Sequence, residues 1–89
     1  MTEGPWTLRF AARAQRDLRR LDRPVRERIY EALERICQDP QQAGSLRRLS
    51  GRPESRLRVG GWRVLLELDA PERVIYVKHV LHRSRAYRD

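Results

Sequence analysis

Hydrophobic and polar residues alternate near the N-terminus of the chain. Trp6, Leu8 and Phe10 are separated by Thr7 and Arg9. A period of two is the spacing of a strand that buries one of its two faces. The pattern therefore predicts a short N-terminal strand.

Two stretches with helical spacing follow this strand. The apolar positions are Ala11, Ala14, Leu18 and Leu21 in the first stretch, and Val25, Ile29, Leu33 and Ile36 in the second. This spacing predicts two amphipathic helices, the first of about three turns. Pro24 suits the first turn of the second helix, with Asp22 or Arg23 at its cap. Asp39 and Pro40 end that helix, so the two helices are expected to form a hairpin with one shared apolar side.

The second half of the chain returns to a period of two. Residues 41–55 are rich in Gln, Gly, Ser, Arg and Pro and predict a loop. Three strands are then predicted, over residues 56–59, 62–68 and 74–81. Gly60 and Gly61 form a two-residue turn between the first two strands, and residues 69–72 form the next turn.

The order of these elements predicts an α+β fold. A three-strand antiparallel meander cannot bury its hydrophobic face alone, so the helix hairpin must cover it. We therefore expect one domain over residues 1–89, with an N-terminal strand, a two-helix hairpin, and a meander packed against the helices. The other face of the sheet is expected to stay open.

The charge of the chain points to an anionic partner. Its 89 residues include 19 arginines, one lysine and 12 acidic residues, for a formal net charge of +8. A genome that favours arginine explains the choice of arginine over lysine, but it does not explain the excess of positive charge. Such an excess on a small domain predicts binding to RNA, to DNA or to an acidic protein.

Several other classes of protein are disfavoured. Cys37 is the only cysteine and falls on a helical stripe, so a buried thiol and a reducing compartment are expected. No stretch has the length of a signal peptide or a membrane span, which favours a cytoplasmic protein without a membrane partner. His79 and His82 are three residues apart on a strand and are expected to point to opposite faces, so neither a metal nor another cofactor is expected.

The open face of the predicted sheet gathers arginines. Alternation places Arg56, Arg58 and Arg63 on that face, and Arg83 follows at the end of the last strand. Guanidinium groups so close together repel each other strongly. A bound anion would relieve that repulsion.

These segments resemble the RelE/ParE superfamily of toxins from type II toxin–antitoxin systems. The similar residues are Leu49-x-Gly51, then 56–64 (RLRVGGWRV), then 82–87 (HRSRAY). With the strand and helix hairpin before them, they extend the resemblance over nearly the whole chain. It implies the RelE-like microbial ribonuclease-type fold, a cognate antitoxin as partner, and a toxin–antitoxin complex that binds operator DNA through the antitoxin.

The resemblance implies different activities in its two branches. RelE-like members cleave mRNA on the ribosome without a metal, by attack of a ribose 2′-hydroxyl on the neighbouring phosphate. ParE-like members instead bind DNA gyrase and carry no nuclease site. The spacing of Arg58 and Arg63, with Arg83 and Tyr87, is similar to RelE and favours a ribosome-dependent endoribonuclease, whereas residues 80–82 (VLH) are closer to ParE. A third alternative is an inactive member that acts with its antitoxin as a DNA-binding co-repressor.

The resemblance and the chemistry together assign roles to the residues. The candidate catalytic set is Arg58, Arg63, His82, Arg83 and Tyr87, and the candidate RNA-binding set is Arg56, Arg58, Arg63 and Arg85. Arg63 would stabilise charge on the phosphate, and the resemblance places Arg83 beside the leaving oxygen. Arg56 and Arg58 stand where the family often has lysines, and an arginine is a poor base. His82 is therefore the candidate for proton transfer, and Tyr87 would stack on a base or orient the phosphate.

Each of these residues also has a purely structural alternative. Arg56 and Arg58 would then be an ordinary solvated strand face, and Arg63 would pair with Glu67 on the same face. His82 would only orient the C-terminal segment, and Tyr87 would anchor the rim of the core.

Overall fold

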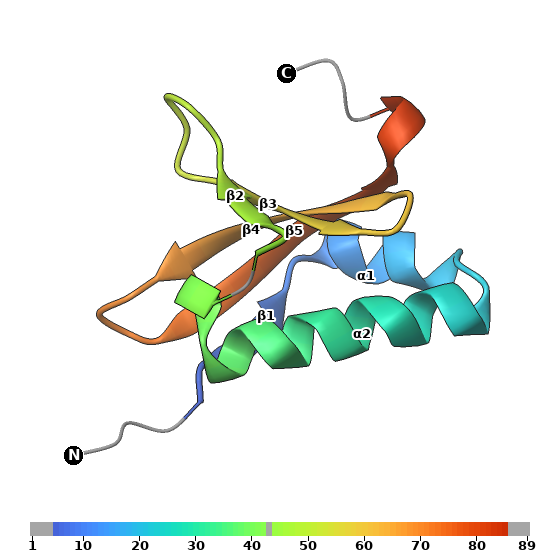
Figure 1. Cartoon of the computed structure of the whole chain (residues 1–89). Helices are drawn as coiled ribbons and strands as arrows, with labels where there is room; N and C mark the ends of the chain where they lie inside the picture. Colours follow the sequence, from blue (N-terminus) through green and yellow to red (C-terminus); the bar gives the residue numbers. More distant parts are fainter. Residues whose placement is uncertain (1–4, 43, 86–89) are drawn as a thin grey trace.

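A computed structural model of the protein describes residues 5–42 and 44–85. Five strands form one sheet in the order β1-β5-β4-β3-β2, with two helices on one side (Figure 1). The strands are β1 (Thr7–Phe10), β2 (Leu46–Arg48), β3 (Ser55–Val59), β4 (Trp62–Asp69) and β5 (Val74–His82). The predicted α+β fold is confirmed, and β3, β4 and β5 form the predicted antiparallel meander.

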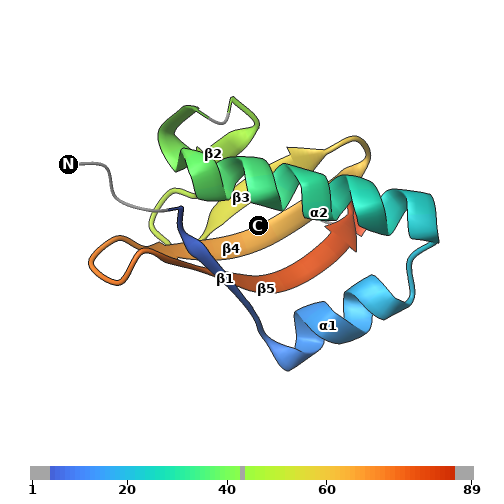
Figure 2. The same cartoon turned by 90° about the horizontal axis from the view of Figure 1, so that it is seen from below.

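The two helices cover one face of the sheet, as predicted. Helix α1 (Ala12–Arg19) lies beside β5, and α2 (Arg23–Gln38) crosses β3 and β4 (Figure 2). Asp22 is the cap residue of α2, and Pro24 lies in its first turn. Neither helix in this part of the chain has the length and apolar content that a membrane crossing requires.

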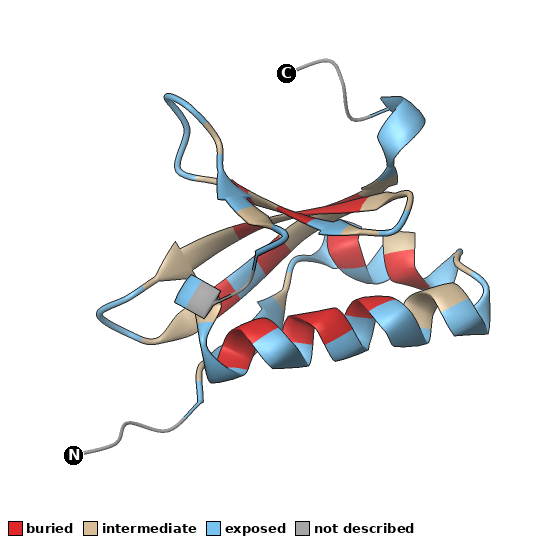
Figure 3. Ribbon diagram, in the orientation of Figure 1, coloured by how far each residue is buried: buried red, intermediate tan, exposed pale blue. Residues whose placement is uncertain are grey.

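The core lies between the helices and the sheet. Figure 3 shows the buried positions on the faces that the helices and the strands turn toward each other. The largest fully buried side chains are Ile29, Leu33, Ile36, Val64, Leu66, Ile75 and Val77. These residues belong to the apolar stripes of α2, β4 and β5, because each element buries the side chains of only one of its faces. Cys37 is buried among them, as predicted.

The sheet has two more strands than the predicted meander. β1 pairs with β5 in parallel, in a register that joins Thr7 to Val74 and Phe10 to Val77. Residues 41–55 were predicted to be a loop, which is wrong for part of that range. β2 pairs there with β3, after a short 3-10 turn, η1 (Pro40–Gln42).

The opposite face of the sheet carries no helix among the described residues. In Figure 1 the β2–β3 loop and the 3-10 turn η2 (Arg83–Arg85) rise on this side of the sheet, away from both helices. Between β3 and β4, Gly60 adopts a φ of 59°, a conformation that a tight turn requires and that glycine adopts without strain. The open face therefore lies between two raised segments.

Candidate nucleic-acid interface

Four arginines meet on the open face near the β3–β4 turn. Arg58 of β3 lies directly opposite Arg63 of β4, and Arg56 lies directly opposite Arg47 of β2. Together with Gly44 and Ser45, these four side chains line a hollow of about 150 Å³. We call the four residues Arg47, Arg56, Arg58 and Arg63 the arginine pocket. The predicted grouping of Arg56, Arg58 and Arg63 on one face is confirmed.

The two cross-strand pairs, Arg47 with Arg56 and Arg58 with Arg63, place like charges directly opposite each other. Like charges directly opposite on neighbouring strands are destabilising, by a few tenths to about 1 kcal/mol for each pair. Neither Arg47 nor Arg58 makes an ion pair with any acidic side chain that the structure describes. The arrangement therefore favours a bound anion, which would turn the repulsion into attraction.

Arg63 is fixed in place by its own turn. Its side chain is only 7% exposed, and Nη1 donates hydrogen bonds to the carbonyl oxygens of Gly60 at 3.1 Å and Trp62 at 2.9 Å. A guanidinium carries five N–H groups, and these two bonds engage only those of Nη1. The suggested ion pair between Arg63 and Glu67 is wrong, because the Glu67 carboxylate binds Lys78 instead.

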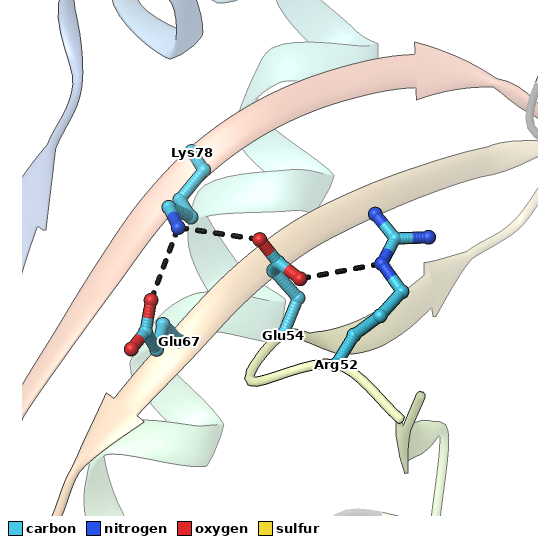
Figure 4. Close-up of polar contacts among 4 residues, drawn as sticks. All are labelled: Arg52, Glu54, Glu67 and Lys78. Atoms are coloured by element: carbon cyan, nitrogen blue, oxygen red, sulfur yellow. Dashed lines mark hydrogen bonds and ion pairs between the residues drawn. The ribbon is translucent and has the colours of Figure 1, made fainter. Parts of the chain in front are cut away.

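A charge-balanced cluster occupies another part of the same face. The Lys78 ammonium donates to Glu67 at 3.0 Å and to Glu54 at 3.3 Å, and Arg52 lies 3.4 Å from Glu54 (Figure 4). The hydrogen bonds that Lys78 donates to Glu67 and Glu54 raise the pKa of Lys78, and the bond from Lys78 lowers the pKa of Glu54. Lys78 is therefore held in its charged form and is not a candidate base. We call Arg52, Glu54, Glu67 and Lys78 the Lys78 network.

His82 lies on the other face of the sheet from Arg63. His82 pairs with Trp62, which is the neighbour of Arg63 along β4, and successive residues of a strand point to opposite faces. With Arg13, Asp17, Arg20, Trp62, His79 and Arg85, among others, it lines a separate hollow beside α1. The structure thus brings Arg56, Arg58 and Arg63 together but does not bring His82 to them.

In the register of β5, His79 lies opposite Leu65 and His82 opposite Trp62, so the two histidines alternate to opposite faces as predicted, although both line the hollow at this edge of the sheet. The β1–β5 pairing ends at Val77, which leaves the following part of the β5 edge open to α1. His79 Nδ1 reaches Asp17 Oδ2 of α1 at 2.7 Å, and the Val80 amide donates to the same oxygen at 2.9 Å. Burial raises the pKa of Asp17, but these bonds, together with the charges of His79 and Arg13, outweigh burial and lower it overall.

The remaining predicted site residues belong to the C-terminal segment. Arg83 begins η2, where its backbone N–H donates to the Gly61 carbonyl oxygen at 2.8 Å. The side chain of Arg85 lines the hollow beside α1 and not the arginine pocket. Tyr87 lies outside the described residues. The sequence analysis also missed Arg47, because it assigned that residue to a loop.

Comparison with protein families identifies the chain. Residues 8–87 match the family described as the ParE toxin of the type II toxin–antitoxin system parDE. The chain belongs to this toxin family. It is thus a toxin of a type II toxin–antitoxin system within the RelE/ParE superfamily, as the sequence motifs predicted. A comparison with curated protein sequences gave no match.

Solved structures similar to this ParE-family toxin include several RelE proteins. A chain of the RelBE2 toxin–antitoxin complex from Mycobacterium tuberculosis has a TM-score of 0.77 and 25% identity, over 93% of this chain and 97% of that chain. The isolated RelE toxin of E. coli has a TM-score of 0.71 and 28% identity, over 92% and 90%. The RelE–RelB complex of Pyrococcus horikoshii has a TM-score of 0.79 over 91% and 98%, and at 19% identity it supports the fold alone.

Proposed function

We propose that this toxin binds RNA through the arginine pocket and cleaves mRNA on the ribosome. The observation that carries the proposal is the double cross-strand pairing of arginines on the open face. Repelling guanidiniums that are held in place by strands form a preorganised site for phosphate oxygens. The similarity to RelE structures also favours the RelE-like nuclease over the ParE-like gyrase binder.

The chemistry of the pocket suits stabilisation of charge on a phosphate. When the ribose 2′-oxygen attacks the neighbouring phosphorus, negative charge increases on the phosphoryl oxygens. Donors that are already oriented toward that charge stabilise the transition state more than the substrate. Arg63 is the best candidate for this role, because its guanidinium is held by the Gly60 and Trp62 carbonyls before any substrate arrives.

The arginine pocket offers charge but no group that exchanges protons near neutral pH. Its described lining consists of glycine, serine and the four arginines. Orientation of the 2′-hydroxyl on the ribosome would then contribute a large part of the acceleration. Proton transfer by His82 stays a prediction, and its position on the other face argues for a different role, which is developed below.

Mapping the ends of mRNA fragments in a cell-free translation reaction tests this proposal. We expect cuts confined to the ribosomal A site in the presence of the toxin, and no cuts in naked mRNA at the same concentration. Intact mRNA during translation, with the toxin folded, would reject the nuclease. A variant with both Arg58 and Arg63 replaced by glutamine serves as the matched control.

A second candidate function is binding of DNA gyrase. The family model that matches residues 8–87 is that of ParE, the branch for which the sequence analysis expects gyrase as the target. A supercoiling assay with purified gyrase separates the two functions. Inhibition of supercoiling at toxin concentrations that leave translated mRNA intact would favour this second candidate.

We also propose that a cognate antitoxin binds next to the arginine pocket. A hollow of about 460 Å³ lies between α2 and β3, with Ala32, Ile36 and Leu57 on its apolar wall. It shares Gly44, Ser45 and Arg58 with the arginine pocket. An acidic, amphipathic segment fits this combination, and the similar RelBE2 structure from Mycobacterium tuberculosis is a toxin–antitoxin complex. Pull-down from the native host should recover such a complex, and recovery of mainly free monomer would contradict it.

A further inference from the structure

We propose that His82 is a positioning residue that joins the β3–β4 turn to η2 and so fixes Arg63 and Arg83 relative to each other. The role in cleavage rests on the proposed nuclease function, whereas the role in holding the turn does not. Two sets of contacts involve the His82 ring and a third involves the turn against which it packs, and none of them requires the ring to exchange a proton with a substrate.

The first contacts seat the His82 ring against the turn. The ring meets the Trp62 ring edge-on, with 5.2 Å between centroids and 85° between planes. It also lies so close to Gly61 that an added Cβ there would be 3.1 Å from His82 Nε2. Apart from the chain neighbours of Gly61, the three heavy atoms nearest to that Cβ all belong to the His82 ring. Gly61 therefore provides the space in which the ring packs.

The second set of contacts ties the same ring to η2. His82 Nδ1 lies 3.3 Å from the Ser84 backbone nitrogen and 3.1 Å from the Ser84 hydroxyl oxygen. A backbone N–H always donates, so Nδ1 acts as the acceptor. A side-chain acceptor that binds the N–H two residues ahead is the geometry of an Asx-turn, which starts a turn of chain in a defined direction. His82 thus sets the direction in which η2 leaves β5.

The third set of contacts connects this junction to both arginines. The carbonyls of Gly60 and Trp62 accept hydrogen bonds from the Arg63 guanidinium, and the carbonyl between them, that of Gly61, accepts one from the Arg83 N–H. Three consecutive carbonyls of one turn therefore hold a pocket arginine by its side chain and a C-terminal arginine by its backbone. Displacement of the turn would move both groups at once.

A double-mutant cycle tests the packing of the ring on Gly61. Gly61 does not have a positive φ, so its backbone accepts alanine, and the atoms nearest to the added methyl, chain neighbours aside, belong to the His82 ring. We expect Gly61→Ala to lower the hydrogen-exchange protection of the Arg83 amide about 2- to 30-fold, the range that loss of a helix cap produces. In a His82→Ala background the same substitution should have almost no further effect, because the imidazole ring that the methyl would contact has been removed. Equal effects of Gly61→Ala in both backgrounds would overturn the proposal.

Asparagine and glutamine at position 82 separate positioning from proton transfer. Asn places an oxygen near the Nδ1 position and forms Asx-turns, whereas Gln places its acceptor farther from the backbone. We expect His82→Asn to restore most of the Arg83 protection and mRNA cleavage that His82→Ala loses, and His82→Gln to restore little. Loss of cleavage in His82→Asn with Arg83 protection intact would overturn the positioning role and favour proton transfer. If the parent does not cleave mRNA, the nuclease proposal fails, and the exchange data still decide the positioning role.

Discussion

The open face of the sheet carries two clusters of charge that are built in opposite ways. In the Lys78 network, two carboxylates surround one ammonium and a guanidinium lies beside one of them, so the four charges sum to zero. In the arginine pocket, four positive charges line one small hollow, and Arg47 and Arg58 have no acidic partner in the described chain. The charges of the first cluster balance each other, whereas those of Arg47 and Arg58 are not balanced by any acidic side chain that the structure describes.

Under the proposed function, this difference separates a structural device from a binding site. The Lys78 network joins the segment before β3 to β4 and β5, and its members hold each other in their charged forms. The arginine pocket instead places like charges directly opposite each other on neighbouring strands, an arrangement that is destabilising in general. The net charge alone does not distinguish these cases, because both clusters contribute cations to it.

The largest expected effect is on catalysis. Arg63→Ala should lower the rate of mRNA cleavage about 100- to 1000-fold, the effect of removing one preorganised donor from a transition state. Glu67→Gln, on the same strand and face, should leave the rate within about threefold of the parent. Rates of fragment formation in cell-free translation provide the measurement. A folded Arg63→Ala protein that cleaves like the parent would remove Arg63 from the mechanism.

A smaller effect is expected on RNA affinity, and here the two clusters offer a matched pair of variants. Arg58→Gln and Lys78→Gln each remove one positive charge from the open face, so the net charge falls from +8 to +7 in both. Arg58→Gln should reduce the slope of log affinity against log salt by about 0.7, because one phosphate contact on single-stranded RNA is lost. Lys78→Gln should leave the slope unchanged, because its ammonium is already neutralised by Glu54 and Glu67.

Fluorescence anisotropy with a short single-stranded RNA at several salt concentrations measures both slopes. Equal slopes for the two variants would mean that only net charge matters and that the arginine pocket is no specific site. A reduced slope for Lys78→Gln alone would reverse the comparison between the two clusters.

The same Arg58→Gln variant should be more stable than the parent in the absence of RNA. Removal of one of two arginines that face each other across β3 and β4 relieves a repulsion of about 0.2–1 kcal/mol. Urea denaturation in low salt measures this gain, which should shrink as salt screens the charges. A loss of stability would show that Arg58 makes a net favourable contribution to the free protein.

The sequence predicted those elements whose own pattern is periodic. The two helices and the strands β3, β4 and β5 have apolar residues at regular spacing, and their packing follows from it. Strand β2 has three residues, of which only Leu46 is apolar, so no period is visible and Arg47 was missed. The pairing of β1 with β5 joins segments that are far apart in the chain, and nothing in the N-terminal strand itself indicates its neighbour.

The side-chain contacts of the site were less predictable than the strands that carry them. Lys78 finds Glu54 and Glu67 at separations of 24 and 11 residues, and Asp17 finds His79 at a separation of 62. Such pairs depend on strand order and register, which local pattern does not provide. Local alternation was sufficient to group Arg56 with Arg58, because these two residues share one strand.

The smallest effect that we predict concerns the stability of the Lys78 network at different pH values. Because the folded state lowers the pKa of Glu54, its contribution to stability is present above the usual value of 4.5 and is lost as the pH falls through the lowered value. Because the folded state raises the pKa of Lys78, its contribution is present below 10.5 and is lost as the pH rises through the raised value. Lys78→Gln should therefore be slightly less stable than the parent near neutral pH, and the difference should vanish in acid well below pH 4.5 and in strong alkali. Urea midpoints of both proteins across this range provide the measurement, and the other titrating groups cancel in the difference. A constant difference at every pH would mean that Lys78 stabilises the sheet by the packing of its stem and not by its charge.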